Sequence, residues 1–379
     1  MNETGTRTTG ADWAEALATP AVRALRAYDP GHDLVALRRK GAALVELGSN
    51  ENPYGPGPRA LAAAGAVLRG LHRYPDPLGG ALKRALAEKH RVDVSQIILG
   101  NGSHELLMQL AQAFAGPGVD VVASQFGFAV YAIAAQAVGA RLCAAPALPA
   151  AHAMPRGHDL DALAAAITPA TRLVYLANPN NPTGTWFAPD AFAAFMARVP
   201  GGAIVVVDEA YAEIADAPDF GSALPLLDRY RNLVVTRTFS KAYALAGLRV
   251  GYAIGHPAVV ATLERLRESF NVNVVALAAA EAAHGDGQWL RDTVAANARE
   301  RDALAAALRG RGWEVSPSQT NFLLVELGER TAQVEAALLE RRVVLRPMAG
   351  YGLPRHSRIS VGTAAENAHL LEALDEVVA

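Results

Sequence analysis

Short runs of apolar, often β-branched residues recur along the first three quarters of the chain, and each run ends in polar or glycine-rich residues. Runs of about four to eight such residues, bounded by turn-forming residues, are typical of buried strands. The pattern predicts strands at residues 97–99, 120–124, 172–177, 203–208 and 232–236. The segments around them predict helices at residues 59–69, 80–90, 103–115 and 128–139.

Strands that alternate with helices in this way favour a mostly parallel sheet with helices on its faces, which is an α/β arrangement. From about residue 271 the pattern changes to alanine-rich helices, predicted at residues 274–284 and 288–309, and short strands follow at residues 322–326 and 358–361. We therefore expect a large α/β domain over residues 46–285 and a smaller α+β domain over residues 286–379.

Composition narrows the classes of protein to consider. The net charge of −2 argues against a nucleic-acid binder, which needs a basic face. The single cysteine, Cys143, excludes an intramolecular disulfide and a cysteine metal cluster. The N-terminus lacks the shape of a secretory signal, and no run approaches the roughly 18 apolar residues of a membrane span. We expect a cytoplasmic protein that binds no nucleic acid, membrane or metal.

Four of the predicted strands end in polar or glycine-rich motifs. These are Gly100-Asn-Gly-Ser-His-Glu105, Asn178-Pro-Asn-Asn-Pro-Thr-Gly184, Asp208-Glu-Ala-Tyr211 and Arg237-Thr-Phe-Ser-Lys241. Ligands bind at the carboxyl ends of the strands in such sheets, so we expect the four motifs to meet in one crevice. The first motif opens a predicted helix, whose backbone N–H groups are suited to hold a phosphate.

Each motif has a plainer interpretation when it is taken alone. A lysine such as Lys241 is usually solvated, and Asp208 could simply cap a helix. However, Asp208 follows four apolar residues, which indicates a buried carboxylate that needs a cationic partner. A lysine just past a buried strand, flanked by hydroxyl-bearing residues, is suited to react as an amine. His104 is better explained as a helix-start residue than as a metal ligand, because no second histidine stands at ligand spacing.

In combination, the motifs resemble the pyridoxal-5′-phosphate enzymes of the aspartate aminotransferase fold, and within that group the chain is similar to the histidinol-phosphate aminotransferases. The resemblance runs nearly from end to end and rests on Tyr28-Asp-Pro-Gly31, Ser49-Asn-Glu-Asn-Pro-Tyr54, Arg73-Tyr-Pro75, Asn181-Pro-Thr-Gly184, Asp208-Glu-Ala-Tyr211, Ser240-Lys241, Ala246-Gly-Leu-Arg249 and Arg358-Ile-Ser-Val-Gly-Thr363. It implies fold type I of the pyridoxal-phosphate transferases, with a large cofactor-binding domain. Residues 1–45 would form an N-terminal arm that belongs to the small domain.

The resemblance also implies a role for each residue around the cofactor ring. Lys241 would form the Schiff base with pyridoxal 5′-phosphate and later carry a proton between the substrate and the cofactor. Asp208 would keep the pyridine nitrogen protonated, because a nearby opposite charge favours the charged form. Tyr211 and Asn181 would hydrogen-bond the 3′-oxygen of the ring, and Phe128 would stack on its face.

The same resemblance implies how the cofactor phosphate is bound. The residues assigned to the phosphate are Ser103 and His104, through backbone N–H groups, and Thr238, Ser240 and Arg249, through side chains. Tyr74 would reach the phosphate from the other subunit of a homodimer with shared active sites. The chain departs from the family at two positions: Ser103-His104 replaces a common Ala-Asp pair, and Phe128 replaces a frequent stacking tyrosine. Neither change removes a proton-transfer group.

The implied reaction is a step of histidine biosynthesis, the transfer of an amino group between L-glutamate and imidazole-acetol phosphate to give 2-oxoglutarate and L-histidinol phosphate. The resemblance assigns substrate binding to Tyr28, Asn181, Arg346 and Arg358. Arginine suits both substrates, because its planar fork binds carboxylate and phosphate in bidentate fashion. Of the two arginines, Arg358 matches the carboxylate-binding position of the family more closely.

Two other activities remain open on the sequence alone. One is an aromatic or broad-range amino-acid aminotransferase, and the other is a decarboxylase of a phosphorylated amino acid. A non-catalytic cofactor-binding module is disfavoured, because Lys241, Asp208 and Tyr211 are all present.

Overall fold

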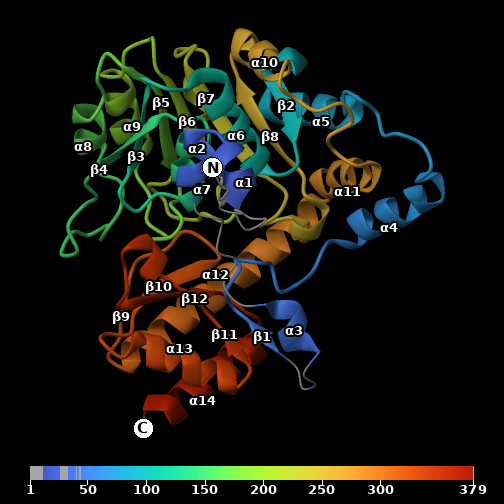
Figure 1. Cartoon of the computed structure of the whole chain (residues 1–379). Coiled ribbons are helices and arrows are strands. Elements are labelled where there is room, and N and C mark those ends of the chain that lie inside the picture. Colours follow the sequence, from blue (N-terminus) through green and yellow to red (C-terminus); the bar gives the residue numbers. More distant parts are fainter. Residues whose placement is uncertain (1–11, 26–32, 40, 42–43, 379) are drawn as a thin grey trace, which may run out of the picture.

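The protein is described here by a computed structural model that covers residues 12–25, 33–39, 41 and 44–378. Within these residues the largest sheet has seven strands in the order β2-β8-β7-β6-β5-β3-β4 (Figure 1). β8 runs antiparallel to both of its neighbours, and all the other neighbouring strands are parallel. The strands are β2 (Ile97–Gly100), β3 (Asp120–Ser124), β4 (Arg141–Ala145), β5 (Thr171–Ala177), β6 (Ile204–Asp208), β7 (Leu233–Thr238) and β8 (Gly251–Gly255).

Each face of this sheet has its own apolar core, because successive side chains of a strand point to opposite faces. On β5, Leu173 and Tyr175 pack on one face, whereas Val174 and Leu176 pack on the other. The first face is covered by α6 (Ser103–Phe114), α7 (Ala129–Ala137) and α10 (Pro257–Leu263). The second is covered by α5 (Gly80–His90), α8 (Leu160–Ala165), α9 (Pro189–Met196) and α11 (Val274–His284). Helices on both faces are what a mostly parallel sheet requires.

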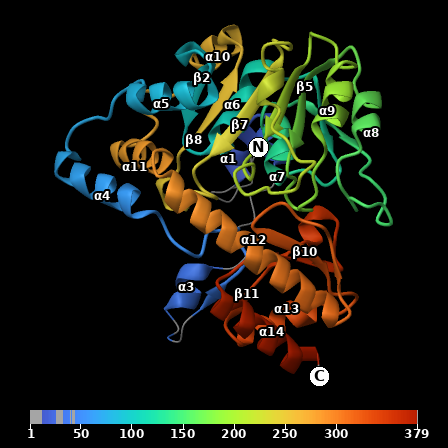
Figure 2. The same ribbon diagram turned by 180° about the vertical axis from the view of Figure 1, so that it is seen from behind.

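The C-terminal part has a smaller antiparallel sheet in the order β12-β13-β10-β9. Its strands are β9 (Glu314–Val315), β10 (Phe322–Glu326), β12 (Arg346–Pro347) and β13 (His356–Ser360). The helices of this part are α12 (Gly287–Gly310), α13 (Thr331–Glu340) and α14 (Ala364–Val378). Figure 2 shows α12 running from the large sheet region down to this smaller one.

The N-terminal segment joins the two parts. β1 (Val45–Glu46) pairs in parallel with β11 (Val343–Val344), so this segment belongs structurally to the C-terminal part. The chain then passes beside α12, where Asn52 Nδ2 donates to Thr293 Oγ1, and enters α4 (Pro58–Val67), which packs against α11 to one side of the molecule (Figure 2). The remaining N-terminal helices are α1 (Asp12–Leu17), α2 (Pro20–Ala24) and α3 (Leu34–Arg38).

The fold predicted from the sequence is confirmed, with differences in detail. The strands β1, β4, β8, β9, β11 and β12 were not predicted, and β13 begins at His356 rather than at residue 358. The domain borders at residues 45 and 285 stay a prediction. In the described part of the chain, no helix is both long enough and apolar enough to cross a bilayer. The same residues contain no group of three His, Cys, Asp or Glu side chains that could hold a metal ion.

Candidate active site

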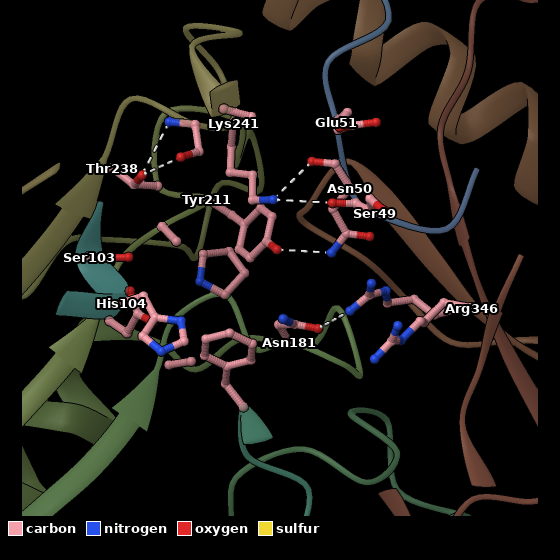
Figure 3. A pocket seen from close by; sticks show the side chains of 18 of the residues that line it. Ser49, Asn50, Glu51, Ser103, His104, Asn181, Tyr211, Thr238, Lys241 and Arg346 are labelled. Carbon is pink, nitrogen blue, oxygen red and sulfur yellow. Dashed lines mark hydrogen bonds between the residues drawn. The ribbon is translucent and has the colours of Figure 1, made fainter. Parts of the chain in front are cut away.

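A pocket of about 400 Å³ lies at the carboxyl ends of β5, β6 and β7, between the large sheet and the C-terminal part (Figure 3). The start of α6, the loop after β1 and the strands β12 and β13 complete its wall. Most of the predicted site residues line it, and they are Ser103, His104, Phe128, Asn181, Asp208, Tyr211, Thr238, Ser240, Lys241, Arg249, Arg346 and Arg358. The expectation that the four strand-end motifs meet in one crevice is therefore met.

Lys241 stands three residues after the end of β7 and points its amine into the pocket (Figure 3). Its Nζ donates to the backbone oxygens of Asn50 at 3.1 Å and Ser49 at 3.4 Å. Burial, together with the positive charge of Arg358, lowers the pKa of Lys241 to about 8. At pH 7 about a tenth of this amine is therefore neutral, and the neutral amine is the form that attacks a carbonyl.

Asp208 is the last residue of β6, and its buried carboxylate faces the pocket. Thr236 Oγ1 donates to one carboxylate oxygen at 3.0 Å, and the Tyr131 hydroxyl donates to the other at 3.3 Å. Burial raises the pKa of Asp208 to about 6. Both of these protein partners are neutral hydroxyls, so a positively charged group in the pocket would relieve the cost of burying the carboxylate.

Tyr211 is buried beside Lys241, and its ring packs edge-on against Phe322 with the centroids 5.4 Å apart. Its hydroxyl accepts a hydrogen bond from Asn50 Nδ2 at 2.9 Å. Burial raises the pKa of Tyr211 to about 12, so the hydroxyl keeps its proton at neutral pH. It can therefore donate a hydrogen bond into the pocket.

One end of the pocket is built to hold an anion. α6 begins at this end with Gly102 as its N-cap, so no side chain caps the first N–H groups of the helix, and its first two residues, Ser103 and His104, line the pocket. Arg249 Nη1 donates to Ser240 Oγ at 3.3 Å, and its guanidinium lies so close to Gly102 that an added Cβ would meet Nη2 at 2.6 Å. Thr238 Oγ1 donates to Ser240 Oγ at 3.0 Å, which fixes the hydroxyls of this end.

The opposite end carries two arginines from the C-terminal part. Arg346 on β12 and Arg358 on β13 are directly paired in the register of the small sheet. Arg358 is buried, and it donates to Asn181 Oδ1 at 2.6 Å and to the Gly48 oxygen at 2.9 Å. Its guanidinium also lies 5.2 Å from the centre of the Phe322 ring. The pocket is thus positive at both ends.

The two other predicted site residues are Tyr28 and Tyr74. Tyr28 lies outside the described residues. Tyr74 is 82% exposed and stacks on Phe270, with ring centroids 4.5 Å apart. It does not line the pocket of its own chain, and its predicted role in a neighbouring subunit stays a prediction.

Two residues of the site were missed by sequence reasoning. Tyr131 was treated as part of a helix, yet its hydroxyl reaches Asp208 while its ring stacks on Tyr175 at 4.9 Å. Asn50 was quoted within a motif but given no role, yet it contacts both Lys241 and Tyr211. The only available signal for Tyr131 was its position three residues after Phe128, on the same side of a helix.

The family model of aminotransferase class I and II matches residues 42–374 of the chain. The chain belongs to this family. Histidinol-phosphate aminotransferase 2 of Pseudomonas fluorescens (strain Pf0-1) is 47% identical over 368 residues, which cover 96% of this chain and 98% of that protein. The prediction that this protein is an aminotransferase is confirmed.

Two solved aminotransferase structures share the fold. The histidinol-phosphate aminotransferase from Sinorhizobium meliloti, in complex with pyridoxal-5′-phosphate, matches with a TM-score of 0.83 and 32% identity, over 95% of this chain and 97% of that chain. A mutant aspartate aminotransferase from Thermus thermophilus matches with a TM-score of 0.82 and 25% identity, over 95% and 99%. The predicted fold type I is thereby confirmed.

Proposed function

We propose that this aminotransferase transfers the amino group between L-glutamate and imidazole-acetol phosphate, and so acts as a histidinol-phosphate aminotransferase in histidine biosynthesis. The observation that carries the proposal is a pocket in which Lys241 and Asp208 lie between two cationic ends, Arg249 at one and Arg346 with Arg358 at the other. The reaction needs both ends, because its cofactor and both of its substrates carry anionic groups. The 47% identity to a protein of this name supports it.

Pyridoxal 5′-phosphate is the cofactor, and the residues of the pocket fit it. When bound, it supplies a carbonyl carbon that holds the amino group and a ring that accepts electrons. Lys241 would hold that carbon, and Asp208, whose side-chain partners are the hydroxyls of Thr236 and Tyr131, would face the ring nitrogen. Arg249 and the first N–H groups of α6 would hold the phosphate, in the cradle that Gly102 leaves open.

At the other end, Arg358 would bind the carboxylate of glutamate, and Arg346 would bind the second anion. Glutamate carries two carboxylates, whereas histidinol phosphate carries a phosphate and no carboxylate, so one pair of arginines must accept both in turn. Their pairing in the register of β12 and β13 places two forked donors at one wall of the pocket. Tyr28 is proposed to assist from the N-terminal segment.

We also propose that the enzyme is a homodimer with shared active sites. Large apolar side chains are exposed along α4 and the segment that follows it, and they are Leu61, Leu68, Leu71, Tyr74 and Leu78. Exposed apolar side chains gathered in this way mark a protein–protein interface. Tyr74 would reach the phosphate of the partner subunit from this surface. The proposed location is the cytoplasm, because a phosphorylated substrate does not cross a bilayer unaided.

The function is tested by spectroscopy and by substrate comparison. L-Glutamate should bleach the visible absorbance of the bound cofactor, and 2-oxoglutarate should restore it; no change would exclude an aminotransferase of glutamate. Among histidinol phosphate, phenylalanine and tyrosine as amino donors, kcat/KM should be highest for histidinol phosphate. Equal values for the three donors would favour the broad aromatic aminotransferase, and release of carbon dioxide from a phosphorylated amino acid would favour the decarboxylase.

A further inference from the structure

Asn50 connects the reactive side of the pocket to the C-terminal part of the chain. It is 1% exposed and adopts a left-handed backbone with φ of 55°. Its backbone N–H donates to Ser360 Oγ at 2.8 Å, and Ser360 Oγ donates back to Asn50 Oδ1 at 3.2 Å. Its carbonyl oxygen accepts from Asn321 Nδ2 at 3.0 Å and from Lys241 Nζ at 3.1 Å. Its side-chain Nδ2 donates to the Tyr211 hydroxyl at 2.9 Å.

These contacts determine the direction in which the Tyr211 hydroxyl points. Ser360 donates to the amide oxygen of Asn50, so the amide nitrogen is the atom that faces Tyr211. An amide nitrogen only donates, and the phenolic oxygen must therefore accept. The hydrogen of that hydroxyl is then turned away from Asn50 and toward the pocket that Tyr211 lines (Figure 3).

We propose that Asn50 is a positioning residue, which orients the Tyr211 hydroxyl as a hydrogen-bond donor toward the ring oxygen of the cofactor. Ser360 and Asn321 hold Asn50 from the C-terminal part, so the orientation of Tyr211 depends on how that part is docked. The proposal rests on the cofactor role proposed above for Tyr211. It adds a residue whose side chain acts on the reaction through another residue.

A purely structural role for Asn50 makes a different prediction. Asparagine tolerates a left-handed backbone better than most residues, so Asn50 could be present only for its φ angle. Glycine adopts this backbone without strain and keeps the carbonyl oxygen that accepts from Lys241. Asn50→Gly therefore removes the side-chain amide alone, and a residue needed only for its backbone would tolerate it.

The test is a pH titration of the visible absorbance of the bound cofactor in four proteins: the wild type, Asn50→Gly, Tyr211→Phe and the double variant. A hydrogen bond from Tyr211 would stabilise negative charge on the ring oxygen. It would therefore lower the affinity for the proton that this oxygen shares with the Lys241 nitrogen. Losing the donation should raise the titration midpoint. We expect Asn50→Gly to raise it by on the order of 0.5–1 pH unit, which is the size of shift expected from the loss of one hydrogen bond.

The double variant tests whether Asn50 acts through Tyr211. If Asn50 acts through Tyr211, then Asn50→Gly shifts the midpoint in the wild type and adds nothing in Tyr211→Phe. An equal shift in both backgrounds, or none in either single variant, overturns the proposal. A shift in Tyr211→Phe without one in Asn50→Gly refutes only the role of Asn50. An unchanged midpoint in Tyr211→Phe refutes the cofactor role of Tyr211 itself, and the proposal for Asn50 falls with it.

A second variant covers the case in which Asn50→Gly does not fold. Ser360→Ala keeps Asn50 itself and removes the hydroxyl that donates to its amide oxygen and accepts from its backbone N–H. A smaller shift of the midpoint in the same direction is expected, and it should also vanish in the Tyr211→Phe background. A folded Ser360→Ala protein that binds the cofactor with an unchanged midpoint would contradict the proposed orientation of the amide.

Discussion

Replacing Arg358 by alanine tests the anion-binding end of the pocket. The guanidinium is buried and fixed by Asn181 Oδ1 at 2.6 Å and by the Gly48 oxygen at 2.9 Å, so it is preorganised for a ligand anion. Loss of a buried, hydrogen-bonded charge partner costs about 2–5 kcal/mol of binding free energy. At about 1.4 kcal/mol for each factor of ten, kcat/KM should fall by about 30-fold to 5,000-fold.

The loss should affect both glutamate and histidinol phosphate, because the same guanidinium is proposed to serve both substrates in turn. Steady-state kcat/KM with each donor measures it. Arg358→Lys keeps the charge but not the planar fork, so its loss should be intermediate. Arg341→Ala is the matched control, since Arg341 pairs with Glu376 on the surface of the C-terminal part and should leave kcat/KM unchanged. A loss below about tenfold for both donors in Arg358→Ala would refute the assignment, since Arg358 would then contribute less than about 1.4 kcal/mol of binding free energy.

Four further predictions concern the remaining groups of the pocket. Arg346→Ala should impair histidinol phosphate and spare phenylalanine, which has a single carboxylate for Arg358 and no phosphate; equal losses in kcat/KM would remove Arg346 from the phosphate site. Asp208→Ala should still bind the cofactor, but its single-turnover rate with glutamate should fall on the order of a hundredfold or more. An unchanged rate would show that Asp208 acts only as a helix cap. The uptake of cofactor by the apo-protein should accelerate with pH around a midpoint near 8, the lowered pKa of Lys241, whereas a midpoint near the ordinary value of 10.5 would contradict its burial. Because that pKa is lower in the folded than in the unfolded chain, Lys241 should also make the apo-protein more stable as the pH rises from about 8 to 10.5.

The residues at strand ends could be predicted from the sequence, because a buried strand makes the polar residue that follows it conspicuous. Asp208 and Lys241 were found in this way, and the parallel sheet brought them together as expected. The role of Tyr131 could not be predicted in this way. An aromatic residue inside a helix gives the same sequence pattern whether it only packs in the core or also donates to a carboxylate. Its second role depends on the distance of 3.3 Å to Asp208, which only the folded chain defines.

The limits of the fold prediction have similar causes. β4 is a partly exposed edge strand that begins with Arg141, and β8 is a five-residue strand with glycine at both ends, so neither has a long apolar run. The role of Asn50 could not be predicted, because it depends on the φ angle of this residue and on partners far along the chain. Local sequence determines which elements form, but it says little about contacts between distant segments.

The pairing of β1 with β11 affects the order in which the parts of the chain fold during synthesis. Asn50 follows β1 closely, yet Ser360, which holds it, lies 310 positions later. During synthesis the large sheet can assemble from segments that emerge one after another, whereas the N-terminal strand must wait for almost the whole chain. The contacts of Asn50 are thus among those of longest sequence separation, and such contacts form late because closing the loop costs entropy before any contact repays it. A newly made chain would therefore contain the large sheet before it contains a finished pocket, and truncation near the C-terminus would remove activity while leaving that sheet's strands intact.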